Sequence, residues 1–269
     1  MEHQQNKHCL IIGAMKCGTT SLFHSLSKQC PLINASRVKD TKFFVDQEIG
    51  GNWEKGLDWY LSLFPQANGI KLEASTHYAK YPDYTKVAAR IKQCLPAVKL
   101  IYLVRDPLRR AISHFFHNVL VDKEPLDINA AFSSSGNKYL HYSDYALQLS
   151  QYHDYFEPEE ILTLNLLEEE KQTESLARLK RFLDIENHPF VLERSNTTQN
   201  NFVKAQEKMS LDPNIIHHST DNIERALKFG LNHNTLGKMI HQCREQAIRF
   251  QKFYPFSIEN WLTDYDNYL

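Results

Sequence analysis

Short apolar runs alternate with amphipathic segments along the first two thirds of the chain. Runs rich in β-branched and large apolar residues predict strands at Cys9–Gly13, Ile70–Ala74, Val98–Val104 and Ile161–Asn165. Apolar residues at helical spacing predict helices at Thr19–Lys28, Trp53–Phe64, Tyr84–Cys94, Arg109–Val119 and Ser175–Leu183. From Asn222 onward the pattern is mostly helical. Strands that alternate with helices indicate an α/β fold, with a central parallel β-sheet flanked by α-helices and a helical C-terminal part.

The pattern gives no sign of more than one domain. A chain of 269 residues is long enough for one sizeable hydrophobic core, and neither an internal repeat nor a low-complexity tract divides it. We therefore expect a single domain over residues 1–269. The least patterned stretch is Asn196–Pro213, which is polar and is predicted to be a mobile loop.

Composition narrows the functional classes. The formal net charge is −1, so no overall basic field indicates a nucleic-acid partner. No window approaches the roughly 20 apolar residues that span a bilayer, and the polar start MEHQQNKH is unlike a secretory signal. Five scattered cysteines without a CxxC pair favour a reducing, cytoplasmic location. The histidines lack metal-ligand spacing, so we expect no metal.

A glycine-bounded loop follows the first expected strand. The stretch LIIGAMKCGTTSLFHSL contains an apolar run, a loop between Gly13 and Gly18, and the start of a helix. Unpaired N–H groups and the helix dipole favour an anion at such a helix start. Gly18 lets the backbone approach that anion, and Lys16 adds a positive charge. The three residues after Gly18 add hydroxyl donors. The alternative is that Thr19 or Ser21 only caps the helix.

This loop departs from the nucleotide-triphosphate pattern GxxxxGK[ST]. Gly13 and Gly18 have the required spacing, but Thr19 occupies the position of the lysine. An apolar run that ends in a magnesium-binding aspartate is also missing, and the nearest candidate, Asp106, follows Arg105. A magnesium-dependent, kinase-like phosphotransferase is therefore the weaker alternative.

The stretch LIYLVRDPLRRAISHFF carries a second candidate anion site. Arg105 follows the most strand-like segment of the chain, where α/β proteins place ligand contacts. Ser113 lies eight residues later, in the next helix. An arginine binds a phosphate bidentately, and a serine hydroxyl adds one donor. The alternative is that Arg105 pairs with a structural carboxylate and Ser113 is an ordinary helix residue.

Together the two stretches resemble the sulfotransferases that use 3′-phosphoadenosine-5′-phosphosulfate (PAPS). The chain is most similar to the branch that contains the heparan-sulfate sulfotransferases and their bacterial relatives. Three further segments resemble that family in the same order: KDTKFF at 39–44, GLDWYLSLFP at 56–65 and LEASTHY at 72–78. The resemblance covers roughly residues 10–118, with a looser fit through Asp184, and implies a P-loop-like fold.

The resemblance also implies roles for individual residues. The 5′-phosphosulfate is assigned to the loop residues Lys16, Cys17, Gly18, Thr19, Thr20 and Ser21. The 3′-phosphate is assigned to Arg105 and Ser113. Lys16 neutralises the charge that builds on the bridging oxygen as the sulfur–oxygen bond breaks. The implied product is 3′,5′-bisphosphoadenosine (PAP), no metal is needed, and the acceptor is a hydroxyl or amine of a small molecule, a lipid or a saccharide.

The expected general base lies at a position where this sequence differs from the family. The segment KDTKFF places Asp40 at a position where the family usually has glutamate. An aspartate is one methylene shorter, so it must lie closer to the acceptor or act through a water. We predict Asp40 as the base, with His77 as its strongest rival. The alternative is that Asp40 caps a turn and that His77, His114 or His117 serves instead.

Two further departures concern charge around the site. The family often has a lysine where this chain has Ala74, and Lys39 and Lys42 either compensate for it or are solvated charges. The family's basic C-terminal loop has no clean match, and Lys204 and Lys208 are the candidates for it. These departures leave open a third class, a nucleotide-binding relative that has lost catalysis.

Overall fold

The computed structural model describes residues 7–121, 123–124, 127–134, 136–193 and 221–269. The chain forms two compact units. The first consists of Met1–Arg105 and Leu147–Ser195, and the second of Asp106–Ala146 and Asn196–Leu269. The predicted mobile loop, Asn196–Pro213, and the candidates Lys204 and Lys208 lie outside the described residues.

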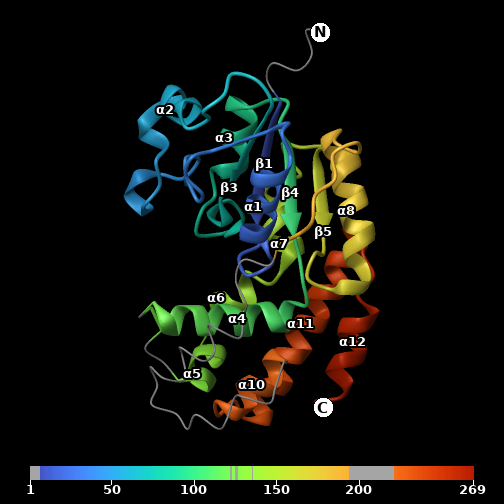
Figure 1. Ribbon diagram of the computed structural model, residues 1–269. Coiled ribbons are helices and arrows are strands. Elements are labelled where there is room, and N and C mark those ends of the chain that lie inside the picture. Colours follow the sequence, from blue (N-terminus) through green and yellow to red (C-terminus); the bar gives the residue numbers. More distant parts are fainter. Residues whose placement is uncertain (1–6, 122, 125–126, 135, 194–220) are drawn as a thin grey trace. The chain divides into compact units, whose positions relative to one another are not determined.

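A five-stranded parallel sheet forms the centre of the first unit. Its strands are β1 (His8–Gly13), β2 (Ile33–Ala35), β3 (Ile70–Ala74), β4 (Lys99–Leu103) and β5 (Ile161–Leu164). They are ordered β2-β3-β1-β4-β5, and every pair is parallel. In Figure 1 β1, β3, β4 and β5 are labelled within this sheet. The four strands predicted from the sequence are confirmed, and the parallel sheet is as expected.

Helices of the first unit pack against this sheet. They include α1 (Thr19–Gln29), α2 (Gly56–Ser62), α3 (Val87–Cys94) and α8 (Glu169–Leu183). Helix α1 contacts β1, β2 and β3, and α8 contacts the edge strand β5, as Figure 1 shows for α8. All six residues of β1 are buried, which is the pattern of a strand covered on both faces. The short helix α7 (Tyr145–Ser150) contains the boundary between the units.

The predicted helix Trp53–Phe64 is wrong in one respect, because it is two helices. A 3₁₀ turn, Trp53–Lys55, precedes α2, and Gly56, the first residue of α2, has a φ of 78°. An L-residue with a side chain rarely adopts this φ, so the glycine allows the backbone to change direction there. The helix predicted to begin at Tyr84 begins instead at Val87.

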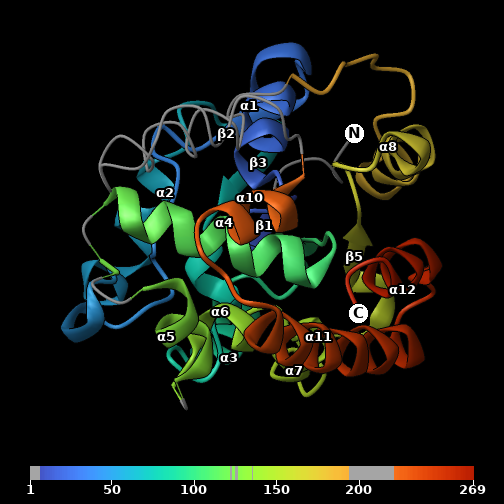
Figure 2. The same cartoon turned by 90° about the horizontal axis from the view of Figure 1, so that it is seen from below.

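The second unit, in its described part, is helical. It contains α4 (Pro107–Leu120), α5 (Ile128–Ser133), α6 (Lys138–His141), α10 (Asn222–Lys228), α11 (His233–Phe253) and α12 (Glu259–Asp266). Helix α4 packs against α6, α10 and α11, and Figure 2 shows α10 crossing α4. The predicted helical C-terminal part is therefore confirmed. In the portion of the chain that is described, no helix has both the length and the apolar character to cross a bilayer.

Candidate active site

The glycine-bounded loop joins the end of β1 to the start of α1. Ala14 N donates to Leu103 O of β4 at 2.8 Å, and Cys17 N donates to Ala14 O at 3.2 Å. Lys16 and Gly18 both have left-handed backbone, with φ of 72° and 91°. The loop is thus a tight turn held against the neighbouring strand, as a phosphate-binding loop requires.

Helix α1 opens without a side-chain cap. Its N-cap residue is Gly18, and no side chain caps it. The first helical bond of the ladder runs from Leu22 N to Gly18 O at 3.0 Å. The N–H groups of residues 19–21 therefore lie at the open end of the helix, where the dipole favours an anion. The alternative that Thr19 or Ser21 occupies the N-cap is wrong, because Gly18 holds that position.

At both glycines of the loop, neighbouring atoms leave little room for a side chain. A Cβ at Gly13 would lie 2.8 Å from the ring of Tyr102 and 3.0 Å from Cβ of Ala79. A Cβ at Gly18 would lie 3.3 Å from Leu167, in addition to the strain of its positive φ. The loop can pass this close to its neighbours only because neither position carries a side chain.

Arg105 reaches the same loop from the end of β4. Its Nη1 donates to Lys16 O at 3.3 Å, so the guanidinium lies beside the predicted 5′ site. Ser113 belongs to the second unit, where it is buried on α4. Arg105 belongs to the first unit, and the pairing of the two on one phosphate stays a prediction.

Asp106, the one aspartate considered for magnesium, has a structural role. Its Oδ1 accepts from Arg109 N at 2.7 Å and caps α4. Its Oδ2 lies 3.0 Å from Nη1 of Arg109, and the residue is only 4% exposed. Both oxygens are thus engaged in holding the helix. Among the described residues, no cluster of histidine, cysteine, aspartate and glutamate is suited to a metal ion.

Asp40 is tied to the carboxyl end of β3. Its N–H donates to Ala74 O at 2.7 Å, and its Oδ1 accepts from Thr76 N at 3.1 Å. Its Oδ2 lies 2.6 Å from Nζ of Lys39. Burial opposes the charge of Asp40, but Lys39, Thr76 and the nearby His77 together hold the pKa of Asp40 below its ordinary value. Asp40 is therefore ionised at neutral pH and able to accept a proton.

Lysine and histidine side chains lie around Asp40. The side chain of Lys39 is 17% exposed and ion-paired, so it is not a solvated charge. His77 lies close enough to Asp40 to lower its pKa, and its ring packs against Tyr84 at 5.7 Å. His114, in the second unit, is buried against the rings of Tyr139 and Tyr142. Asp40 and His77 thus lie close together, and the assignment of the base to Asp40 stays a prediction.

Three of the predicted residues meet at one edge of the sheet. Lys16 follows β1, Asp40 is bonded to the last residue of β3, and Arg105 follows β4. These strands are neighbours in the order β3-β1-β4, and all are parallel, so their carboxyl ends lie at the same edge. Ligands of open α/β sheets bind at this edge. Two cationic groups and one carboxylate are therefore available there.

A buried carboxylate beside this edge was missed from the sequence. Glu73 of β3 is 0% exposed and accepts hydrogen bonds from Thr41 and Tyr78. The available signal was a glutamate inside the apolar strand IKLEA, within the family-like segment LEASTHY that also contains His77.

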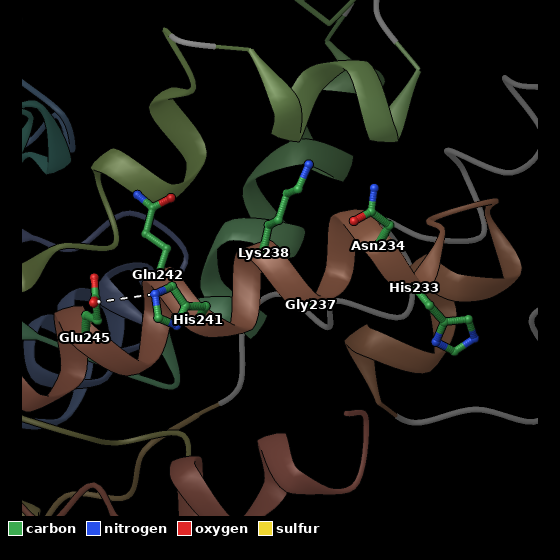
Figure 3. A pocket seen from close by; sticks show the side chains of 7 residues that line it. All are labelled: His233, Asn234, Gly237, Lys238, His241, Gln242 and Glu245. Atoms are coloured by element: carbon green, nitrogen blue, oxygen red, sulfur yellow. Dashed lines mark ion pairs between the residues drawn. The ribbon is translucent and has the colours of Figure 1, made fainter.

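Two surface cavities lie elsewhere, in the second unit. One, of about 620 Å³, runs along an exposed face of α11. Figure 3 shows its lining, with Lys238 and Gln242 projecting from α11 and His241 paired with Glu245 at 3.5 Å. The other, of about 390 Å³, lies between α11 and the segment of α5 and α6. Neither is lined by any residue predicted for the active site.

Comparison with known proteins identifies the family. The family model described as "Sulfotransferase domain" matches residues 6–254. The chain therefore belongs to the sulfotransferase domain family. This confirms the predicted family, while the activity of the whole protein and its donor, PAPS, stay proposals. The match spans residues of both units, and the expectation that residues 1–269 form one domain stays a prediction.

Individual relatives agree with this assignment. The bifunctional heparan sulfate N-deacetylase/N-sulfotransferase 1 of Caenorhabditis elegans is 29% identical over 201 residues, covering 67% of this chain and 22% of the relative. The bifunctional heparan sulfate N-deacetylase/N-sulfotransferase 2 of Bos taurus is 33% identical over 129 residues, covering 46% of this chain and 14% of the relative. The chain thus spans about a fifth or less of these curated relatives.

A solved structure shows the same fold. The sulfotransferase from Alicyclobacillus acidocaldarius is 19% identical, with a TM-score of 0.63, and the likeness covers 94% of this chain and 97% of that one. The predicted P-loop-like α/β fold is confirmed. The predicted roles of the individual site residues remain proposals.

Proposed function

We propose that this sulfotransferase moves a sulfuryl group from PAPS to a hydroxyl or amine of an acceptor and releases PAP. The observation that carries the proposal is the arrangement at the carboxyl edge of the sheet. There the uncapped start of α1 follows β1, Arg105 follows β4 and donates to the Lys16 carbonyl, and Asp40 is bonded to the last residue of β3, so that all three lie at the ends of neighbouring strands. Such an edge offers cations for a phosphosulfate and a base for the acceptor.

The proposed reaction is an in-line displacement at sulfur. The acceptor oxygen or nitrogen forms a bond to sulfur while the bond from sulfur to the bridging phosphate oxygen breaks. The leaving electron pair stays on that oxygen, where the charge of Lys16 stabilises it. The acceptor proton passes to Asp40, which is ionised at neutral pH, since Lys39, Thr76 and His77 outweigh the effect of burial and hold its pKa below the ordinary value. His77 is the rival for this last role.

The donor is proposed to lie along the loop and beyond it. The 5′ end is assigned to Lys16 and the residues that open α1, and the 3′-phosphate to Arg105 and Ser113. The open helix N-terminus and the position of Arg105 support the first two assignments. Ser113 is proposed from the resemblance alone.

We propose a saccharide as the acceptor class, in preference to another small molecule or a lipid. Support comes from the names of the relatives, which are heparan sulfate N-sulfotransferases. An amino sugar is therefore the first acceptor to test. A panel of amino sugars, neutral saccharides, phenols and lipid alcohols with labelled donor distinguishes these classes.

The donor assignment is tested by ligand-induced thermal stabilisation. A ligand that binds only the folded state raises Tm according to its affinity. PAP is expected to raise Tm more than ADP does, and the Arg105→Gln variant is expected to lose that difference. Arg181→Gln, an exposed arginine of α8, is the matched control and should keep it. Equal discrimination by the Arg105→Gln variant and the wild type would contradict the assignment.

The catalytic roles are tested by turnover with a saturating donor. Lys16→Met is expected to lower kcat about 100-fold or more, as loss of an oxyanion contact does. Asp40→Asn is expected to lower it about 10²–10⁴-fold, as loss of a general base does. A near-normal rate for Asp40→Asn with a large loss for His77→Ala assigns the base to His77. A wild-type protein that binds PAP but transfers a sulfuryl group to no acceptor in the panel would be a nucleotide-binding relative that has lost catalysis.

We also propose a cytoplasmic location. The support is that all five cysteines are free thiols, four of them buried, as is usual for proteins of reducing compartments. Fractionation of the source cells, followed by thiol labelling of the protein, tests this. Recovery with oxidised cysteines from an extracytoplasmic fraction would contradict it.

A further inference from the structure

A buried carboxyl group beside the proposed site takes no part in the proposed chemistry. Glu73 lies on β3, one of the inner strands of the sheet, and is 0% exposed. Its Oε1 accepts from Thr41 Oγ1 at 2.8 Å and from the Tyr78 hydroxyl at 3.1 Å, and its Oε2 lies 3.1 Å from the same hydroxyl. A buried carboxyl group needs such partners to offset its desolvation.

Stability alone gives a weak reason for a carboxyl group at this position. The strand residues beside it, Leu72 and Ala74, are apolar and fully buried. Buried polar clusters are often replaced by apolar residues of similar volume without loss of stability. What the cluster supplies, and an apolar side chain would not, is a directional hold on its hydrogen-bond partners.

The partner that matters is Thr41, because it follows Asp40 directly. Asp40 and Lys42 both have left-handed backbone, with φ of 58° and 50°, on either side of Thr41. The Thr41 hydroxyl is directed at Glu73, and the Thr41 carbonyl accepts from Nδ2 of Asn52 at 2.7 Å. The turn is thus held in two directions at the residue between two strained positions.

Tyr78 connects this turn to the other side of Asp40. Its hydroxyl lies 3.1 Å from Thr41 Oγ1 and accepts from Phe43 N at 3.1 Å. Tyr78 belongs to the 3₁₀ helix Thr76–Ala79, whose first N–H donates to Asp40 Oδ1. The segment that carries Asp40 and the segment that bonds its carboxylate are therefore joined through one buried cluster.

We propose that Glu73 is a positioning residue, which acts through Thr41 and Tyr78 to hold the Asp40 carboxylate at the carboxyl end of β3. The proposal deepens the proposed function and rests on it, since Asp40 is the base assigned there. Glu73 itself is fully buried, so it is proposed to act through its hydrogen-bond partners and not by contact with the donor or the acceptor. Its contribution is to kcat, through the orientation of the base, and not to the affinity for the nucleotide.

Substitution of Thr41 tests the proposal with little change in volume. Thr41→Val removes the hydroxyl, Thr41→Ser keeps it, and Thr163→Val makes the same exchange at a buried threonine of β5. We expect Thr41→Val to lower kcat at least tenfold and to leave the Tm shift given by PAP unchanged. Thr41→Ser should restore most of the rate, and Thr163→Val should match the wild type. A rate for Thr41→Val equal to the wild type would overturn the proposal.

A double variant distinguishes positioning of Asp40 from an independent effect. If Thr41 acts through Asp40, Thr41→Val combined with Asp40→Asn is no slower than Asp40→Asn alone. Losses that multiply would overturn the proposal. Glu73→Gln, which keeps the shape and one acceptor oxygen, is the second variant and is expected to lower kcat without changing the PAP shift.

Amide hydrogen exchange tests the same proposal without turnover. The N–H of Asp40 donates to Ala74 O, and the N–H of Thr76 donates to Asp40 Oδ1. In Thr41→Val both amides are expected to exchange at least tenfold faster, while amides of β1 keep the wild-type rate. Unchanged exchange at Asp40 and Thr76 would overturn the positioning role of Glu73, even where the protein transfers a sulfuryl group. A wild type that transfers nothing, with faster exchange in the variant, would instead overturn the proposed function.

Discussion

Lys16 and Asp40 share a backbone conformation that residues with side chains rarely adopt. Their φ values are 72° and 58°, and within the described ranges only Lys42 and Asp184 are other non-glycine residues with positive φ. Each such residue costs on the order of 1–2 kcal/mol, so its surroundings must hold it there. Three of these four positions lie in the two segments proposed to carry the catalytic lysine and the base. Backbone strain is thus concentrated where the chemistry is proposed.

Substitution of Gly13 tests how tightly the loop after β1 is packed. In Gly13→Ala the new Cβ would meet the Tyr102 ring at 2.8 Å. We expect the free energy of unfolding to fall by about 1–3 kcal/mol, as for other overpacked sites. The control is Gly237→Ala in α11, where a Cβ meets open space and should raise stability by about 0.5–1 kcal/mol. Urea denaturation measures both, and a Gly13→Ala variant as stable as the wild type would contradict the packing described.

The site residues differ in how visible they are in the sequence. Lys16 and Arg105 lie in local patterns, a strand followed by a loop or a charged helix start, and such patterns predict phosphate binding by themselves. The pairing of Lys39 with Asp40 and the burial of Glu73 depend on which segments the fold brings together. Thr41 and Glu73 are 32 residues apart in sequence. No local pattern predicts a contact at that separation.

At the scale of elements, one arginine ties three helices of the second unit together. Arg109 of α4 lies 3.0 Å from Asp106, 2.6 Å from Asp221 and 3.2 Å from Asp264 of α12. Asp106 is the N-cap of α4, and Asp221 is the N-cap of α10. Burial disfavours the charge of Arg109, but these three carboxylates outweigh it and raise the pKa of Arg109 above its ordinary value.

Removal of this guanidinium is expected to be costly. In Arg109→Met three carboxylates lose their shared partner in a partly buried setting, and we expect a loss of about 3 kcal/mol or more in the free energy of unfolding. The matched control is Arg244→Met, whose ion pair with the exposed Asp266 at 2.6 Å is more open to solvent than the Arg109 cluster and should cost less than about 1 kcal/mol. Chemical denaturation of both variants gives the two values. Similar losses in the two variants would show that Arg109 is not the link described.

The elements also show what the apolar pattern can predict. Each predicted strand lies within one residue of its position in the sheet, because buried parallel strands are continuous apolar runs. Helix α8 begins at Glu169, six residues before the predicted start at Ser175. Its first turns read EEKQTE and carry no apolar signal, so only the acidic first turn marks them. Strand β2, Ile33–Ala35, was missed because three residues are too few to show a period.

For the whole molecule, two buried groups on neighbouring strands give opposite dependences of stability on pH. Burial, with the charge of Lys71, lowers the pKa of His8 on β1 from 6.5 to about 4. Burial, with the charge of Asp40, raises the pKa of Glu73 on β3 from 4.5 to about 7, against the opposing hydrogen bonds. Both groups are therefore held neutral by the fold in the mildly acidic range, and each is more readily charged in the unfolded chain.

The direction of each pH dependence follows from the number of protons that the native and unfolded states bind. The unfolded chain binds a proton at His8 that the native state lacks, so this contribution to stability is present above pH 6.5 and is lost as the pH falls to about 4. The native state binds a proton at Glu73 that the unfolded chain lacks, so that contribution is present below pH 4.5 and is lost as the pH rises to about 7.

Two variants separate these titrations. Relative to Glu73→Gln, the wild type is expected to lose at most about 3 kcal/mol as the pH rises from 4.5 to 7. Relative to His8→Phe, which keeps a ring beside Phe64, it is expected to lose a similar amount as the pH falls from 6.5 to 4. Urea denaturation of the three proteins at closely spaced pH values measures both differences. A wild-type stability that runs parallel to that of Glu73→Gln across this range would show that Glu73 is charged in the native protein, which would contradict the effect of burial described for it.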